Sequence, residues 1–377
     1  MSRPLVRLYA LVGAALALLA TAASSASGSA GPAAAVFVQT NGLAANAIAV
    51  FDRAADGHLT PAGTYPTGGQ GGAAAGASSD KLASQGSLLY DRADNLLVAV
   101  NAGSDSLSVF SVDGDRLSLI QVVSSGGQFP ASVAADGKLL YVLNAGGDGN
   151  VSGFRIAGGK LHPLQGSTRS LDLGNTNPPF FLTSPGQVGF SPDGSKLVVT
   201  TKASTNAIDV FAIQPNGRPS AAPVVNAPAT QVPFAFTFQP GSGRLVDGEA
   251  GTSSLTTYAL QGDGSLTDPR SLSDGQVALC WITRVRGFYY VSNTGSNTVS
   301  GYRLDAAGTP SLVGATGVVA TTEAGTIDSA AAADRFLYVE TGITSTVDEF
   351  RVEADGTLTS LGTVTGLPPG IEGIAAT

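Results

Sequence analysis

Short apolar runs recur along the chain, each followed by a polar residue and a turn rich in Gly, Ser and Asn. The next segment ends in Phe or Tyr nine or ten residues later, and its apolar residues alternate with period two, as in Ser-Leu-Ser-Val-Phe at 106–110. Successive copies lie about 50 residues apart, a spacing typical of propeller blades. The seven runs are VFVQTN (36–41), LLVAVN (96–101), LLYVLN (139–144), KLVVTT (196–201), RLVDGE (244–249), FYYVSN (288–293) and FLYVET (336–341).

Each copy predicts a blade of four short antiparallel strands, named a to d from the axis outward. In the third copy these strands are expected at 131–135, 139–144, 151–156 and 160–165. Asp-Gly and Asn-Gly pairs between the runs favour tight turns, and no long segment after residue 30 has a helical period. We therefore predict an all-β, seven-bladed β-propeller.

The two ends of the repeat array are incomplete in complementary ways. No candidate for strand a precedes Val36, whereas Gly370–Ala376 resembles a strand a without a blade. We expect the C-terminal strand to complete the first blade, which closes the ring and removes the exposed sheet edges.

Two insertions interrupt the repeats. Residues 68–84 consist mostly of Gly, Ala and Ser and predict a surface loop after the first blade. Residues 171–186 join the third and fourth blades and contain Phe180 and Phe181. Long loops on a rigid scaffold often carry function; the alternative is that the two phenylalanines pack onto the blades.

The first 30 residues differ from the rest of the chain. Arg3 and Arg7 precede an apolar run at 8–20, and small residues follow to position 30. The run is short for a membrane span and suits a signal peptide. We expect residues 1–30 to be removed, leaving one secreted propeller domain at 31–377 that is not held in a membrane. The alternative is a retained N-terminal anchor.

Composition narrows the possible partners. Charged residues make up 13% of the chain, the net charge is −8, and no basic run exists, which argues against nucleic-acid binding. Cys280 is the single cysteine, so no internal disulfide forms, and its apolar neighbours predict a buried, inert thiol. One Cys with His58 and His162 forms no usual zinc set. We predict no cofactor and no metal motif. The alternative is a calcium ion bound by carboxylates in the channel.

The repeats LLVAVNAGSDSLSVFSV, LLYVLNAGGDGNVSGFRI and FYYVSNTGSNTVSGYRL, with GQVGFSPDGSKLVV, resemble the blades of the seven-bladed lactonase family. That family includes propeller-type 6-phosphogluconolactonases and carboxymuconate-lactonizing enzymes. The resemblance implies a propeller that hydrolyses the ester bond of a lactone. The lactonizing members use a channel histidine with arginines and a carboxylate. His58 and His162 lie near the start of an outer strand and do not match that histidine.

We expect the site at the channel mouth formed by the turns between strands b and c. Lactone hydrolysis needs a base for water and a cation or donor for the oxyanion. Glu249 is the predicted base and Lys202 its electrostatic partner; the alternative is an exposed ion pair of little energetic value. Asn101, Asn144, Asn293 and Gln187 are the predicted substrate-binding residues, although each Asn can instead cap its own turn.

The predicted mouth is acidic. Lys202 is its one clear cation, which argues against phosphorylated ligands; the carboxylates are Glu249, Glu323, Asp328, Glu340 and Glu372. We therefore predict a monomeric, exported lactonase-like protein with a small-molecule ligand. The alternative is a non-catalytic propeller that binds a protein or a glycan.

Overall fold

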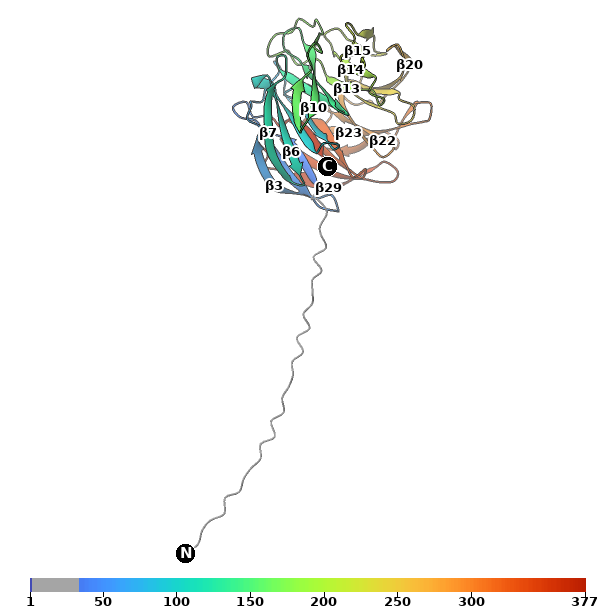
Figure 1. The fold of residues 1–377 in the computed structure, drawn as a ribbon. Coiled ribbons are helices and arrows are strands. Elements are labelled where there is room, and N and C mark those ends of the chain that lie inside the picture. Colours follow the sequence, from blue (N-terminus) through green and yellow to red (C-terminus); the bar gives the residue numbers. More distant parts are fainter. Residues whose placement is uncertain (2–33) are drawn as a thin grey trace. The chain divides into compact units, whose positions relative to one another are not determined.

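The computed structural model describes Met1 and residues 34–377, and the chain from Ala35 folds into seven antiparallel sheets (Figure 1). The described residues 34–377 lie within one compact unit. The predicted signal peptide lies outside the described residues, so it stays a prediction. Within residues 34–377 the one helical element is a 3₁₀ turn at Ala102–Ser104, and no helix is long and apolar enough to cross a membrane.

Each sheet is one blade, whose strands run in the order a to d from the axis outward. The first blade combines β30 (Ile374–Ala376) with β1 (Ala35–Gln39), β2 (Ala47–Arg53) and β3 (Leu59–Pro66). The second is β4 (Leu88–Asp91), β5 (Leu96–Asn101), β6 (Ser106–Asp113) and β7 (Arg116–Ser124). The third is β8 (Pro130–Asp136), β9 (Leu139–Asn144), β10 (Asn150–Ala157) and β11 (Lys160–Pro163), with β12 (Arg169–Ser170) beside β10.

The remaining four blades follow the same pattern. The fourth is β13 (Gln187–Phe190), β14 (Lys196–Thr200), β15 (Ile208–Ala212) and β16 (Val224–Asn226). The fifth is β17 (Pro233–Phe238), β18 (Leu245–Glu249), β19 (Ser254–Leu260) and β20 (Leu266–Ser273). The sixth is β21 (Leu279–Val285), β22 (Phe288–Asn293), β23 (Thr298–Leu304) and β24 (Pro310–Leu312), with β25 (Val318–Thr321) beside β23. The seventh is β26 (Thr326–Ala332), β27 (Phe336–Thr341), β28 (Thr346–Val352) and β29 (Leu358–Val364).

The innermost strands form a closed ring. Strands β30, β4, β8, β13, β17, β21 and β26 each contact the next, and β26 contacts β30. The C-terminal strand closes the ring as predicted, because Val36, Phe37 and Val38 of β1 pair with Ala376, Ala375 and Ile374. Both predictions, the seven-bladed all-β fold and its closure, are confirmed.

A repeated tyrosine ties neighbouring blades together. Tyr141, in strand b of the third blade, donates its hydroxyl to the Gly217 carbonyl in the c–d turn of the fourth at 2.7 Å. Tyr290 does the same to Gly356, and Tyr338 to Gly57 across the closure. The three glycines adopt positive φ values of 86°, 90° and 102°, a region that side chains disfavour. The repeated tyrosine therefore forms a hydrogen bond with the c–d turn of the next blade.

The insertion at 68–84 is not a surface loop, and that prediction was wrong. Its last part enters the channel mouth, where Leu82, Ala83 and Ser84 are buried. The Ser84 hydroxyl donates to Ala131 in the third blade, and Gln85 bonds both backbone groups of Ile282 in the sixth. Small side chains fit the narrow space between the inner strands, so a composition typical of loops here fills a channel.

Candidate functional site

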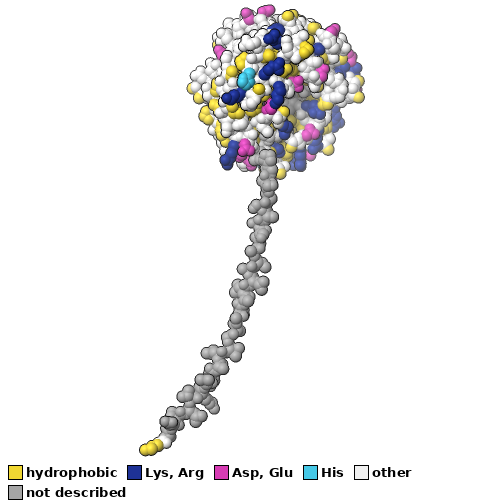
Figure 2. Space-filling view, in the orientation of Figure 1, with side chains coloured by type: hydrophobic (Ala, Val, Ile, Leu, Met, Phe, Trp, Pro, Cys, Tyr) yellow, Lys and Arg dark blue, Asp and Glu magenta, His cyan; other side chains and the backbone are white. Residues whose placement is uncertain are grey.

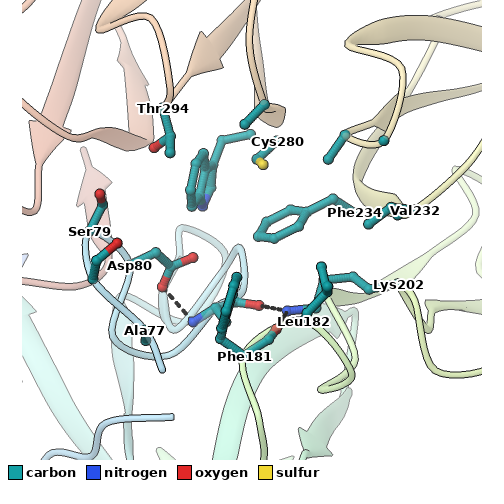
Figure 3. A pocket seen from close by; sticks show the side chains of 16 residues that line it. Ala77, Ser79, Asp80, Phe181, Leu182, Lys202, Val232, Phe234, Cys280 and Thr294 are labelled. Atoms are coloured by element: carbon teal, nitrogen blue, oxygen red, sulfur yellow. Dashed lines mark hydrogen bonds between the residues drawn. The ribbon is translucent and has the colours of Figure 1, made fainter. Parts of the chain in front are cut away.

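A pocket of about 230 Å³ lies at the channel mouth between the fourth, fifth and sixth blades (Figure 3). The blades supply Lys202, Phe234, Cys280 and Trp281, while the insertions supply residues 77–80, Ala83, Phe181 and Leu182. Phe180 is bridged to Ala75, so the two insertions are joined to each other. Phe180 and Phe181 remain partly exposed, and the Phe181 side chain lines the pocket.

Lys202 follows the end of β14 and is almost fully buried. Its ammonium donates to the carbonyls of Ala83 at 2.5 Å and Phe181 at 2.6 Å, and to the Ser184 hydroxyl at 2.9 Å. These contacts use all three N–H groups, and they join both insertions to the fourth blade. Burial lowers the pKa of Lys202 to about 8, although nearby carboxylates act in the opposite direction.

Asp80 is the acidic residue in the pocket wall, and one of its two oxygens accepts no N–H or hydroxyl hydrogen bond. Its Oδ1 accepts from the Ala83 backbone N–H at 2.5 Å, while no N–H or hydroxyl group of the described residues donates to Oδ2. Figure 3 shows the second oxygen directed toward the pocket interior. Burial raises the pKa of Asp80; a hydrogen bond with Glu372 and the charge of Lys202 partly offset that rise.

Three further carboxyls lie buried near Asp80 in the channel. Burial and neighbouring acids raise the pKa values of Glu340 and Glu372 well above their ordinary range, and burial raises the pKa of Asp328 to about 7. Glu372 shares a hydrogen bond with Asp80, which raises its own pKa further. Glu372 is therefore the protonated partner and Asp80 the more acidic one. No three acidic, His or Cys side chains within residues 34–377 are arranged to hold a metal ion.

Cys280 and Trp281 lie in β21 on the opposite wall of the pocket. Cys280 is free and buried, and burial raises the pKa of its thiol to about 12. Near neutral pH the thiol is therefore protonated and a poor nucleophile. The Trp281 indole N–H donates to the Ser84 carbonyl at 3.0 Å, which fixes the ring beside the inserted segment.

The structure separates the two residues predicted as a catalytic pair. Lys202 lines the pocket, whereas Glu249 does not, and no ion pair joins them within the described chain. Both Glu249 oxygens are occupied inside the fifth blade. They accept from the Thr230 N–H at 3.0 Å, from the Thr230 and Thr256 hydroxyls, and from the Tyr258 hydroxyl.

The predicted substrate-binding residues lie outside the pocket lining. Asn101 and Asn293 donate to serine hydroxyls of strand c in their own blades, at 2.8 and 3.0 Å. Asn144 donates to the Asn150 side chain at 2.9 Å. Gln187 bonds both backbone groups of Phe236 and so links the inner strands of the fourth and fifth blades. Their geometry is that of turn and strand supports.

Sequence reasoning missed Asp80. The available signal was its position, because Asp80 is the one acidic residue in the insertion 68–84. A single carboxylate in a segment of Gly, Ala and Ser indicates a functional site only when that segment is known to enter the channel.

Comparison with known proteins agrees with the propeller geometry. Residues 5–171 match the model of the family described as "Lactonase, 7-bladed beta-propeller". No curated protein matches the chain in sequence.

Solved structures share the fold at low identity. A periplasmic gluconolactonase from Pseudomonas aeruginosa is 18% identical with a TM-score of 0.67, covering 90% of this chain and 98% of its own. A Bacteroides fragilis protein with the provisional description of 6-phosphogluconolactonase is 18% identical with a TM-score of 0.66, covering 92% and 98%. A Lactobacillus plantarum protein is 17% identical with a TM-score of 0.67, covering 92% and 99%. At such identities the likeness shows the fold.

Proposed function

Because this chain is similar to the seven-bladed β-propeller lactonases, in sequence over residues 5–171 and in fold beyond them, we propose that it hydrolyses a lactone in the channel-mouth pocket. The observation that carries the proposal is the Asp80 carboxyl. It is buried, one of its oxygens accepts no N–H or hydroxyl hydrogen bond, and that oxygen faces a pocket that also contains a cation.

Asp80 is the base in this proposal. Its Oδ2 accepts a proton from water as the water oxygen attacks the lactone carbonyl carbon. The ring C–O bond then breaks, and the Asp80 proton passes to the departing alkoxide, giving a hydroxy acid. The protonated Glu372 behind Asp80 favours the ionised form of Asp80 through their hydrogen bond. Asp80 thus returns to its starting state after each cycle.

Lys202 contributes charge rather than a direct hydrogen bond. All three of its N–H groups are already donated to the protein. Its positive charge lies in an apolar wall, 5.0 Å from the centre of the Phe234 ring. In a medium of low polarity a positive charge in the pocket wall stabilises the oxyanion of the tetrahedral intermediate.

The proposal is tested by a hydrolysis screen over uncharged and charged lactones, in which acid release is followed between pH 4 and 10. We expect kcat/KM to rise as Asp80 ionises and to fall above about pH 8, where Lys202 loses its charge. A screen without hydrolysis of any lactone contradicts the proposal. If the decrease of kcat/KM at alkaline pH persists unchanged in Lys202→Met, the proposed role of Lys202 is contradicted.

We also propose that the protein is exported. The supporting features are Arg3, Arg7 and the apolar run at 8–20, and the Pseudomonas aeruginosa structure with this fold is described as periplasmic. N-terminal sequencing of the protein recovered from the secreting host tests this proposal. Mature protein that still begins at Met1 contradicts it.

A further inference from the structure

We propose that the ligand of this pocket is an uncharged lactone that carries a short apolar substituent, rather than a phosphorylated or polyhydroxylated sugar lactone. This inference rests on the proposed function and names its substrate class. It is argued from the wall of the pocket, from the state of its one cation, and from its size.

The wall of the pocket is apolar over most of its extent. Phe181, Leu182, Phe234 and Trp281 face it from different segments, as Figure 3 shows for the first three. Val232, Ala250 and Ala278 complete the same surface. Specific binding of a sugar lactone requires several protein hydrogen-bonding groups around its hydroxyls. An apolar wall instead favours the burial of a hydrocarbon substituent.

The apolar surface continues out of the pocket onto the rim. Leu182 and Phe181 line the pocket and are also 40% and 36% exposed. Val277, which precedes the lining residue Ala278, is 59% exposed. An alkyl chain attached to a lactone ring inside the pocket can extend over the exposed Phe181 and Leu182 side chains.

The pocket offers an anion no free cationic donor, and its small polar side chains include the Ser78 and Ser79 hydroxyls. Lys202 is the one basic side chain among the lining residues, and its three N–H groups are bonded to Ala83, Phe181 and Ser184. Behind Asp80 lie the carboxyls of Glu372, Glu340 and Asp328. A phosphate normally requires several charge-assisted donors, so a permanent anion would enter this site without a cationic partner and beside the acidic Asp80.

The size of the pocket limits the substituent. The pocket has a volume of about 230 Å³. This volume suits a lactone ring with a few methylene groups, and a longer chain extends over the rim.

The test uses a homologous series of γ-lactones from γ-butyrolactone to γ-nonalactone, together with gluconolactone and its 6-phosphate. We expect kcat/KM to rise about fourfold per methylene until the pocket and rim are covered. The phosphorylated lactone should be at least a hundredfold poorer than the best alkyl lactone. Preference for the phosphorylated lactone, or no dependence on chain length, overturns the inference while the proposed hydrolysis stands.

Two leucine variants test where the alkyl substituent of the lactone lies. Leu182→Ala should flatten the dependence on chain length, because it shortens the wall that the substituent covers. Leu119 is 45% exposed on the outer strand β7, far from the pocket lining, and Leu119→Ala should leave the dependence unchanged. Equal slopes in both variants contradict the placement of the substituent along Leu182.

Binding is measured separately from turnover. Trp281 is the only tryptophan of the chain and lines the pocket, so its fluorescence reports occupancy. If no lactone is hydrolysed but alkyl lactones change this fluorescence with affinities that rise along the series, the proposed function fails and the ligand class stands. If the series neither binds nor reacts, both fail.

Discussion

At the scale of single residues, Lys202 is the contact that holds the two insertions against the fourth blade. Lys202→Met leaves the acceptors at Ala83, Phe181 and Ser184 without their donor. Each buried acceptor left unpaired costs about 1–3 kcal/mol, and loss of a buried charge offsets part of this cost. We expect the free energy of unfolding to fall by about 2–4 kcal/mol in urea titrations.

Lys81 provides the matched control for Lys202. Its ammonium also donates to two carbonyls, those of Ala77 and Ser78, but the side chain is only partly buried. Lys81→Met should cost less than about 1 kcal/mol. Equal losses in the two variants would mean that Lys202 does not hold the insertions.

Glu249 belongs to the same scale, and its contacts predict a structural effect. Glu249→Gln replaces one acceptor oxygen by a donor, where Thr230, Thr256 and Tyr258 all supply hydrogens. We expect the free energy of unfolding to fall by about 1–3 kcal/mol. The rate of lactone hydrolysis per folded molecule should stay within twofold of the unchanged protein. A hundredfold loss of rate with unchanged stability would restore Glu249 as the base.

At the scale of elements, the closing strand β30 completes the first blade from the far end of the chain. Deleting residues 369–377 removes the partner of Val36–Val38 and exposes the inner edge of β1. We expect the truncated protein to lose the cooperative thermal transition of the full chain. Melting within two degrees of the full chain would contradict the closure.

A single substitution tests the same strand in a protein that still folds. Ile374 is buried in β30, whereas Ile343 is 59% exposed in a turn of the seventh blade. Ile374→Ala should lower the free energy of unfolding by about 2–5 kcal/mol, and Ile343→Ala should change it little.

The repeated strands were predictable because their signal is local. Tyr141 lies in a short apolar run bounded by turn residues, and β8 to β11 lie within two residues of their predicted bounds. The first blade lacked a strand a and the segment 370–376 resembled a strand a without a blade, so pairing the two predicted the closure. The path of 77–87 was not predictable, because small residues carry no pattern, and its position depends on contacts such as Ser84 with Ala131 and Gln85 with Ile282.

In the candidate site, too, some residues could be predicted from the sequence and others could not. Lys202 was predicted from its place after a strand, and that place is correct. Its partner was not predictable, because Asp80 reaches it from an insertion more than one hundred residues earlier in the chain. Asn101 and Asn293 repeat at one blade position, but the same repetition arises when each copy supports its own turn.

At the scale of the whole molecule, the face shown in Figure 2 carries interspersed charges of both signs, while the carboxyls with strongly shifted pKa values are buried. Burial raises the pKa of Asp328 to about 7 and that of Asp209 to about 6, and those of Asp247, Glu340 and Glu372 rise well above their ordinary values. Between about pH 4 and pH 7 the folded protein therefore binds more protons than the unfolded chain.

The sign of the pH dependence follows. A carboxyl whose folded pKa is raised contributes stability that is complete below its unfolded pKa and is lost as pH rises through the folded pKa. We expect the free energy of unfolding to be greater at pH 5 than at pH 7.5 by more than about 1.4 kcal/mol, the equivalent of one pKa unit. Urea titrations at both pH values check this. Greater stability at pH 7.5 would mean that these carboxyls are ionised in the folded protein.

The central claim is that the pocket opens lactones through Asp80, and the most direct test is kcat/KM for an uncharged lactone in Asp80→Asn. The substitution keeps an acceptor for the Ala83 N–H and removes the base. Asp209→Asn is the control, because Asp209 is also buried with a free oxygen but lies outside the pocket lining. We predict at least about a hundredfold loss in Asp80→Asn and less than a twofold change in Asp209→Asn. Full activity in a folded Asp80→Asn protein would contradict the claim.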